Sequence, residues 1–135
     1  MATSDNVVRA GLTPKLRDVP TLVSMLTYTT AAPDAQLMSP TKFRGLDNTL
    51  LYDPPIEEFS VLATKLEAGQ AEIHPALEGP SIVIVTDGSG TLAFDGDEDG
   101  ALKVGSVWFV AAGQEVTVKA EGEGIVLYRA FVEAS

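Results

Sequence analysis

Apolar and polar residues alternate in short runs from residue 58 to the end of the chain. In residues 59–64, Phe59, Val61 and Ala63 occupy one set of alternate positions, which predicts a half-buried strand. Residues 81–85 are β-branched and apolar on both faces, as in a strand that is covered on both sides. A period of two residues is the signature of β structure, so this part of the chain is predicted to form a sheet.

Further strands are predicted downstream by the same pattern. They lie at 91–94, 101–104, 107–110, 116–119 and 125–132. The segment Asp87–Gly90 is predicted to be a hairpin turn, because it is rich in glycine and has no phosphate-loop lysine and no following helix. Turns recur every eight to twelve residues, a spacing typical of an antiparallel sandwich or jelly roll.

The first part of the chain has a helical pattern. Val19, Leu22, Val23 and Leu26 form one apolar stripe, and Asp18 is a good N-cap before Pro20 in the first turn. We expect the helix to end near Tyr28. Prolines at four positions make 33–55 an expected irregular connector; they are Pro33, Pro40, Pro54 and Pro55.

Composition excludes several classes of protein. The chain has 135 residues, about one domain, and its 45% hydrophobic content argues against disorder. There is no cysteine, no transmembrane run and no secretory signal. The net charge of −10 disfavours binding to nucleic acid, since such a surface repels phosphate backbones. The single histidine, His74, limits any imidazole metal site.

The acidic run at 95–100 has the spacing with which a calcium loop begins. Aspartates stand at loop positions one, three and five, and a glycine stands at six. The closing glutamate of such a loop is absent, because Ser106 occupies position twelve. We therefore favour a solvated hairpin tip, with a weak ion site as the minor alternative.

A basic cluster stands out in this acidic chain. Arg9, Lys15 and Arg17 flank a short segment with Gly11 and Pro14. Such a cluster can hold an anion such as a sugar phosphate. The alternative, that the cations pair with acids including Asp5 and Asp18, is favoured by the residues alone.

His74 falls on a ligand position when the glycines are aligned with the metal-binding motifs of the cupin class. With Gly88 and Gly105 as anchors, the other three ligand positions fall on Ala76, Ser81 and Val116. One imidazole does not hold zinc or iron usefully. We therefore expect a cupin barrel without a metal centre, in which His74 is a strand-end or loop residue.

Several long segments resemble type I mannose-6-phosphate isomerase, in its eukaryotic and notably fungal form. They cover nearly the whole chain and lie at 4–15, 19–28, 52–62, 79–84 and 128–134. The resemblance implies a zinc-dependent isomerase that interconverts mannose 6-phosphate and fructose 6-phosphate by proton transfer, with the metal polarising the sugar oxygens. It also implies that the zinc ligands lie upstream of the part that this chain matches.

The resemblance assigns roles to two residues of this chain. Arg9 matches an arginine that lines the substrate pocket and assists catalysis, and Lys15 matches a lysine on the same side of that pocket. No metal ligand is expected in this chain and zinc belongs to the full-length family, so the isolated chain is expected to be inactive.

The resulting picture is a mainly β protein, a cupin-type jelly roll with a short N-terminal α-helix. Residues 1–32 are the expected tail of the catalytic domain, 33–55 the connector and 56–135 a metal-free C-terminal cupin domain. The expected partner is the catalytic domain of the parent enzyme, or a second copy through residues 1–30. A cytoplasmic location is expected, with no membrane partner. The alternative is a free-standing binding or interaction module that takes a hexose phosphate.

Overall fold

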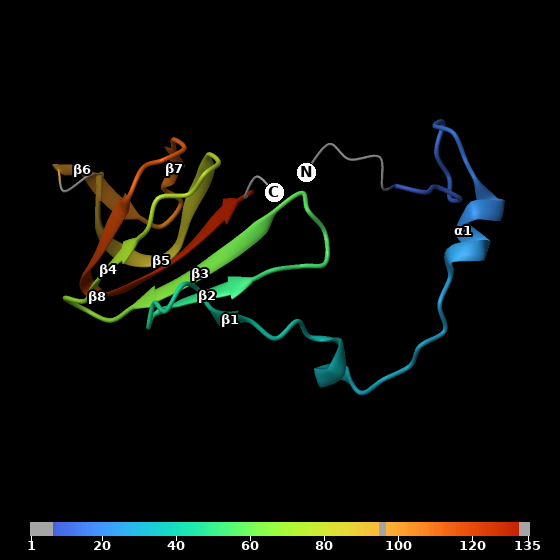
Figure 1. Cartoon of the computed structure of the whole chain (residues 1–135), viewed down its shortest axis with the longest axis horizontal. Helices are drawn as coiled ribbons and strands as arrows, with labels where there is room; N and C mark the ends of the chain where they lie inside the picture. The colour runs from blue at the N-terminus through green and yellow to red at the C-terminus, as the bar shows by residue number, and fades with distance from the viewer. Residues whose placement is uncertain (1–6, 95–96, 133–135) are drawn as a thin grey trace. The chain divides into compact units, whose positions relative to one another are not determined.

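The computed structural model describes residues 7–94 and 97–132, without the side chains of 97–99 (Figure 1). The chain divides into two compact units, Met1–Leu37 and Met38–Ser135. In the described part, no helix has the length and apolar character needed to cross a membrane.

The first unit contains helix α1 (Val19–Met25) and the 3₁₀ helix η1 (Pro33–Gln36). The predicted helix is confirmed, and Asp18 caps it by accepting a hydrogen bond of 3.0 Å from the Thr21 amide. The Thr21 hydroxyl also donates to Asp18, and this bond together with the amide bond lowers the pKa of Asp18. The helix ends at Met25, short of the expected Tyr28, and none of its residues is buried.

The second unit is an antiparallel β structure, as predicted. Its strands are β1 (Thr41–Lys42), β2 (Thr49–Tyr52), β3 (Ser60–Leu66), β4 (Ala71–His74), β5 (Ser81–Phe94), β6 (Asp97–Lys103), β7 (Val107–Val110) and β8 (Val116–Phe131). Within the described residues they form one sheet in the order β1-β2-β3-β8-β5-β6, with β4 on β8 and β7 on β5.

The two long strands, β5 and β8, pair along almost their whole length and build the jelly roll. The first half of β8 pairs with β4 and its second half with β3, so different neighbours cover the two halves. Figure 1 shows both strands curving through the barrel. The described residues from 38 onward thus form a single mainly β unit, of which the alternating pattern predicted the part from residue 58.

The hairpin turn predicted at Asp87–Gly90 was wrong. These residues continue β5, and the register against β8 shifts beside Asp87 and again between Gly88 and Ser89. Gly88 has a φ of 75°, and a Cβ there would stand 2.0 Å from the carbonyl oxygen of Gly124. The glycines therefore serve a bend at which two strands approach closely, rather than a chain reversal.

The alternation at 59–64 predicted a half-buried strand, and the structure shows which face of β3 is buried. Leu62, Thr64 and Leu66 point inward, whereas Val61 and Ala63 are half-buried. A shift of one residue exchanges the two faces of a strand. Leu62 and Leu66 contribute more apolar volume to the interior than Val61 and Ala63, which explains the observed choice.

Part of the expected connector at 33–55 is regular structure. Both β1 and β2 lie within it, and Phe43 between them is 4% exposed in a core cluster. The four prolines stand outside these two strands, where no backbone donor is needed for the sheet. The domain bounds at 32 and 55 stay a prediction.

The acidic run starts directly after β5, and its residues 97–100 belong to β6. These strands pair antiparallel, with Phe94 opposite Asp97, as a hairpin requires. Residues 95 and 96 at its tip are outside the described part, so the ion-site alternative there stays untested.

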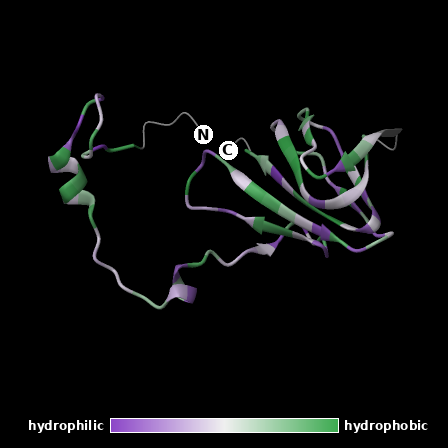
Figure 2. Ribbon diagram, turned by 180° about the vertical axis from the view of Figure 1, so that it is seen from behind, coloured by the Kyte–Doolittle hydropathy of each residue, from purple (hydrophilic) through white to green (hydrophobic). Residues whose placement is uncertain are grey.

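Two separate apolar clusters fill the barrel. One is centred on residues of β5 and β8 such as Val83 and Leu127, and the other contains Phe43, Leu62 and Phe131. Figure 2 shows hydrophobic and hydrophilic residues alternating along these strands. Buried polar residues stand between members of the two clusters along β3 and β8.

Candidate functional site

A layer of buried polar side chains lies between the two apolar clusters. Its members are Thr49, Thr64, Glu72, His74, Ser81 and Arg129, each less than a tenth exposed. On β3, Thr64 stands between Leu62 of one cluster and Leu66 of the other. On β8, Arg129 stands between Leu127 and Phe131 in the same way. Strand alternation therefore places this polar layer inside the barrel.

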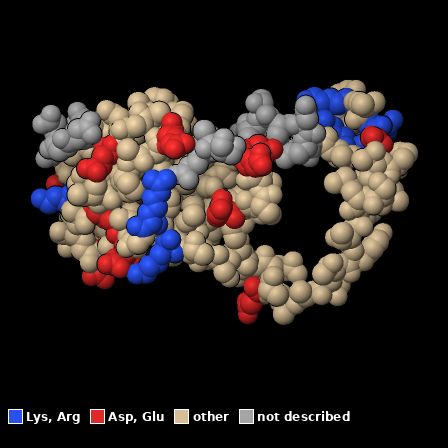
Figure 3. All heavy atoms as spheres, in the orientation of Figure 1, with Lys and Arg blue, Asp and Glu red and all other residues tan. Residues whose placement is uncertain are grey.

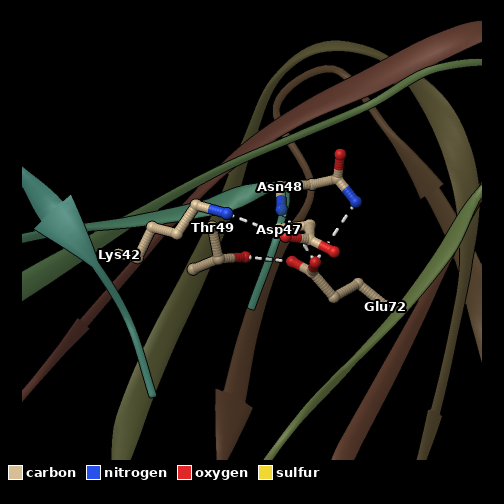
Figure 4. Close-up of polar contacts among 5 residues, drawn as sticks. All are labelled: Lys42, Asp47, Asn48, Thr49 and Glu72. Atoms are coloured by element: carbon tan, nitrogen blue, oxygen red, sulfur yellow. Dashed lines mark hydrogen bonds and ion pairs between the residues drawn. The ribbon is translucent and has the colours of Figure 1, made fainter. Parts of the chain in front are cut away.

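Hydrogen bonds connect most of the layer. The Thr49 hydroxyl donates a short hydrogen bond to the Glu72 carboxylate. The other carboxylate oxygen accepts from the Asn48 amide at 2.9 Å and from its side-chain nitrogen at 3.2 Å (Figure 4). The two threonine hydroxyls, of Thr49 and Thr64, lie 2.8 Å apart. Nε2 of His74 lies 3.2 Å from the first hydroxyl and 3.1 Å from the second.

Proton accounting assigns the tautomer of His74. The single hydroxyl proton of Thr49 goes to Glu72, so the Thr64 hydroxyl donates to Thr49. Both hydroxyl protons are then used, and Nε2 of His74 must be the donor to the two oxygens. The neutral ring consequently carries its proton on Nε2. Its Nδ1 is an acceptor, buried and without a hydrogen-bond partner among the described residues.

Burial keeps His74 neutral. The side chain has no exposed surface. Desolvation, with a further contribution from the positive charge of Arg129, lowers its pKa to about 4, while Glu72 acts in the opposite direction. His74 is therefore a fixed hydrogen-bonding group at neutral pH.

Arg129 is the buried cation of the layer. It has no exposed surface, and its Nε donates to the Ser81 hydroxyl at 2.9 Å. Desolvation lowers its pKa to about 10, which leaves the guanidinium charged at neutral pH. Its two terminal nitrogens have no hydrogen-bond partner in the described part of the chain.

The interior does not fit a metal ion. No group of three or more metal-ligating side chains occurs among the described residues. His74 and Val116 are registered partners, but Val116 offers no ligand atom. Ala76 is exposed and outside any strand, so the alignment that placed it beside His74 was wrong there. The expected strand-end position of His74 is confirmed, since it closes β4.

The predicted substrate residues lie in the other unit. The carbonyl oxygen of Arg9 accepts from the amide of Asp18 at 2.8 Å, which closes the segment between them into a loop before α1. The side chain of Arg9 is half-buried, and that of Lys15 is exposed. None of the three cations of the loop forms an ion pair with Asp18 in the described structure, so that part of the ion-pair interpretation was wrong.

The basic loop contrasts with the charge of the barrel. Figure 3 shows Lys and Arg atoms gathered beside the start of the helix in the first unit. Arg9, Lys15 and Arg17 are the basic residues of that unit. Their loop can attract an anion, but the structure by itself does not test a role in substrate binding.

The residues that the sequence reasoning missed had a recognisable signal. Arg129 occupies an inward position of an otherwise apolar alternation, between Leu127 and Phe131. Thr64 interrupts the same pattern on β3. A charged side chain at a core position of a strand requires a partner, and this requirement marks it for attention.

Comparison with known proteins shows which proteins the chain is similar to. Residues 49–97 match the family model described as phosphomannose isomerase type I C-terminal. The chain is 55% identical to mannose-6-phosphate isomerase of Cryptococcus neoformans over 99% of its own length. It is 48% identical to the enzyme of Schizosaccharomyces pombe over 98%. These alignments cover 31% and 33% of the two relatives, so the chain spans about a third of their length.

Solved structures agree with this placement. A mutant of phosphomannose isomerase from Salmonella typhimurium matches 98% of the chain with a TM-score of 0.73 and 28% identity, over 33% of its own length. A cupin protein from Bacteroides fragilis matches 73% of the chain and 88% of its own length, with a TM-score of 0.56 and 17% identity. The second match shows the fold alone and confirms the expected cupin-type jelly roll. The chain is homologous to the C-terminal part of mannose-6-phosphate isomerases.

Proposed function

We propose that this chain acts as the C-terminal part of a mannose-6-phosphate isomerase, in which a metal-free barrel supports a catalytic part. The observation that carries the proposal is 55% identity to one third of such an enzyme, combined with a barrel interior that does not fit a metal. The zinc that the resemblance implies is then held by residues outside this chain. The comparisons do not favour the free-standing binding module.

In this proposal, Arg9 and Lys15 face the sugar phosphate. Both belong to the basic loop, whose cations have no ion pair with Asp18. A guanidinium binds phosphate or a developing oxyanion through paired N–H groups, whereas an ammonium acts as a point charge. We therefore assign the catalytic and substrate-binding role to Arg9 and a supporting substrate contact to Lys15. A cytoplasmic location belongs to the same proposal.

The apolar surface of α1 supports a partner for the first unit. Val19, Val23 and Leu26 are 49%, 61% and 48% exposed. A seven-residue helix without buried side chains is marginal in water on its own. We assign the catalytic part as the surface that covers these residues, with self-association through 1–30 as the alternative. A monomer of the isolated chain at high concentration, measured by light scattering, supports the first assignment; a concentration-dependent dimer supports the second.

The outer face of the barrel also supports packing against another part. Ile82 and Phe109 are registered partners, as are Ile84 and Val107, and all four are at least 42% exposed. Together they form a contiguous apolar surface on β5 and β7. We assign the part of the enzyme that corresponds to the remaining two thirds of the relatives' length as the partner that covers this surface.

A chimera tests the proposal. This chain replaces the matching third of the Schizosaccharomyces pombe enzyme, and isomerisation of mannose 6-phosphate is assayed with zinc present. We expect activity from the chimera and none from the isolated chain. In the chimera, Arg9→Ala should lower kcat about 100-fold or more, and Lys15→Ala should mainly raise KM. Lys42→Ala, an exposed change in the barrel, is the matched control and should leave both constants unchanged.

Two outcomes contradict the proposal. One is an inactive chimera that is folded and binds zinc. The other is isomerase activity of the isolated chain, which would place a complete active site within it.

A further inference from the structure

The interior of the barrel contains a charge without a counter-charge. Arg129 has no exposed surface, and no carboxylate of the described residues pairs with it. The carboxylate of the polar layer, that of Glu72, already accepts from Asn48 and Thr49. An unpaired buried guanidinium costs several kcal/mol of folding free energy, so an anion beside it would be strongly stabilising.

The guanidinium presents a built donor set. Ser81 holds Nε at 2.9 Å, which restricts the rotation of the group. Both terminal nitrogens are buried without a partner in the described structure. Such a fork matches the two oxygens of a planar oxyanion. Ser81 also lines a groove of about 250 Å³ together with Phe109 and Phe131, so the surface comes within one side chain of the guanidinium.

His74 needs a hydrogen-bond donor, whereas Arg129 needs acceptors. Its Nδ1 is an acceptor by the proton accounting above, and it too is buried without a partner. Thr64, which accepts from His74, lies two residues along β3 from Leu62, the registered partner of Arg129. The two groups therefore belong to one polar layer, which needs both an acceptor pair for Arg129 and a donor for His74.

We propose that the barrel binds a small protonated oxyanion of the class of bicarbonate, whose oxygens accept from the Arg129 guanidinium and whose hydroxyl donates to Nδ1 of His74. The enclosed position of both side chains, neither with exposed surface, selects for a small ion over a sugar phosphate. The site is independent of the isomerase function proposed above, because it uses no residue of the basic loop. It places an anion where the cupin alignment placed a metal ligand.

The test uses the fact that His74 is the only histidine of the chain. Nitrogen NMR of the ring in the ¹⁵N-labelled 135-residue protein therefore reports on one residue. Bicarbonate is titrated in mildly alkaline buffer at constant ionic strength, with sodium chloride and sodium formate as parallel series. Formate has the planar oxygens but no hydroxyl, and chloride has neither.

With bicarbonate we expect a saturable upfield shift of the Nδ1 signal while the Nε2 proton is retained. Formate should bind about tenfold more weakly, and chloride should give no saturable change. Absence of a saturable shift with bicarbonate in the unaltered protein overturns the proposal, because water then satisfies these groups. An equal response to chloride overturns the oxyanion class.

A pair of variants checks the residue assignment. Arg129→Met should weaken bicarbonate binding at least about tenfold. Lys42→Met also replaces a cation by methionine, but at an exposed position, and should leave the titration unchanged. Ser81→Ala, which removes the partner of Nε, is used if Arg129→Met does not fold and should also weaken binding. Undiminished binding in a folded Arg129→Met or Ser81→Ala variant contradicts the assignment.

Discussion

Nε2 of His74 lies 3.1 Å from the Thr64 hydroxyl oxygen, and the ring donates its proton there from a fully buried position. This contact links β4 to β3 through the interior of the barrel. Protonation of Nδ1 would place a second positive charge in a layer that already contains Arg129. The stability of the barrel is therefore coupled to pH through one imidazole.

We expect the free energy of unfolding to fall as the pH is lowered from about 6.5 to about 4. The pKa of His74 is lowered from 6.5 to about 4 in the folded chain, so the unfolded chain binds the proton first and acid favours unfolding. The contribution is complete above pH 6.5 and on the order of 3 kcal/mol is lost by pH 4. Urea unfolding at a series of pH values measures it.

His74→Gln provides the comparison for that slope. Glutamine retains a side-chain donor and does not titrate, so the stability of the variant should depend less on pH in this range than that of the unaltered chain. Parallel curves for the variant and the unaltered chain would show that His74 does not cause the loss.

Thr49→Val should destabilise the barrel by about 2 kcal/mol. The substitution preserves the shape of the side chain but removes the donor to Glu72 and an acceptor of His74, leaving buried polar atoms unsatisfied. Ser60→Ala removes a hydrogen bond of 2.7 Å to Asp53 at an exposed site and should cost less than about 0.5 kcal/mol. Equal losses in urea unfolding would contradict an interior role for Thr49.

Gly88→Ala should destabilise the chain by about 3 kcal/mol or more. The added Cβ would stand 2.0 Å from the carbonyl oxygen of Gly124, and φ is 75°. Gly105→Ala is the matched control, because its φ is 84° but no atom lies within 4 Å of the added carbon. The control should cost only about 1 kcal/mol, the penalty for left-handed backbone. Similar thermal midpoints for the two variants would exclude steric contact as the cause.

Gly100→Ala should change the environment of Trp108, the only tryptophan of the chain. A Cβ at this position would stand 2.5 Å from the tip of the indole ring, so the ring must move away. Trp108 also packs against Phe94, with ring centroids 6.4 Å apart, and this contact would be disturbed. We expect a shift of the tryptophan emission maximum and a cost of about 1–2 kcal/mol. An unchanged emission spectrum would show that the added methyl group fits beside the indole ring without moving it.

Helix α1 shows how much can be predicted from residues that are close together in the sequence. Asp18 and the following apolar spacing predicted a capped helix, because the cap and the turn depend on residues only three positions apart. The point at which the helix ends was less predictable, since Leu26 and Tyr28 have no strong stop signal and both side chains are exposed.

The alternation along β3 shows the limit of that reasoning. The period of two predicted a strand, but Leu62 and Val61 are equally apolar neighbours, and either face satisfies the pattern. The choice depends on which face packs with Leu127 and Phe131 of the neighbouring strand β8, which are remote in the sequence. The same holds for Gly88, whose bend depends on the approach of Gly124.

The sequence by itself determined the β class of the second unit, the N-cap at Asp18 and the poverty of metal ligands, because periodicity, local capping and residue type are properties of neighbouring positions. Only the tertiary structure decided that His74 and Arg129 share one buried polar layer. Their strands, β4 and β8, pair in the sheet although they are remote in the sequence. Because these side chains are excluded from water, each of their polar atoms that lacks a hydrogen-bond partner costs folding free energy.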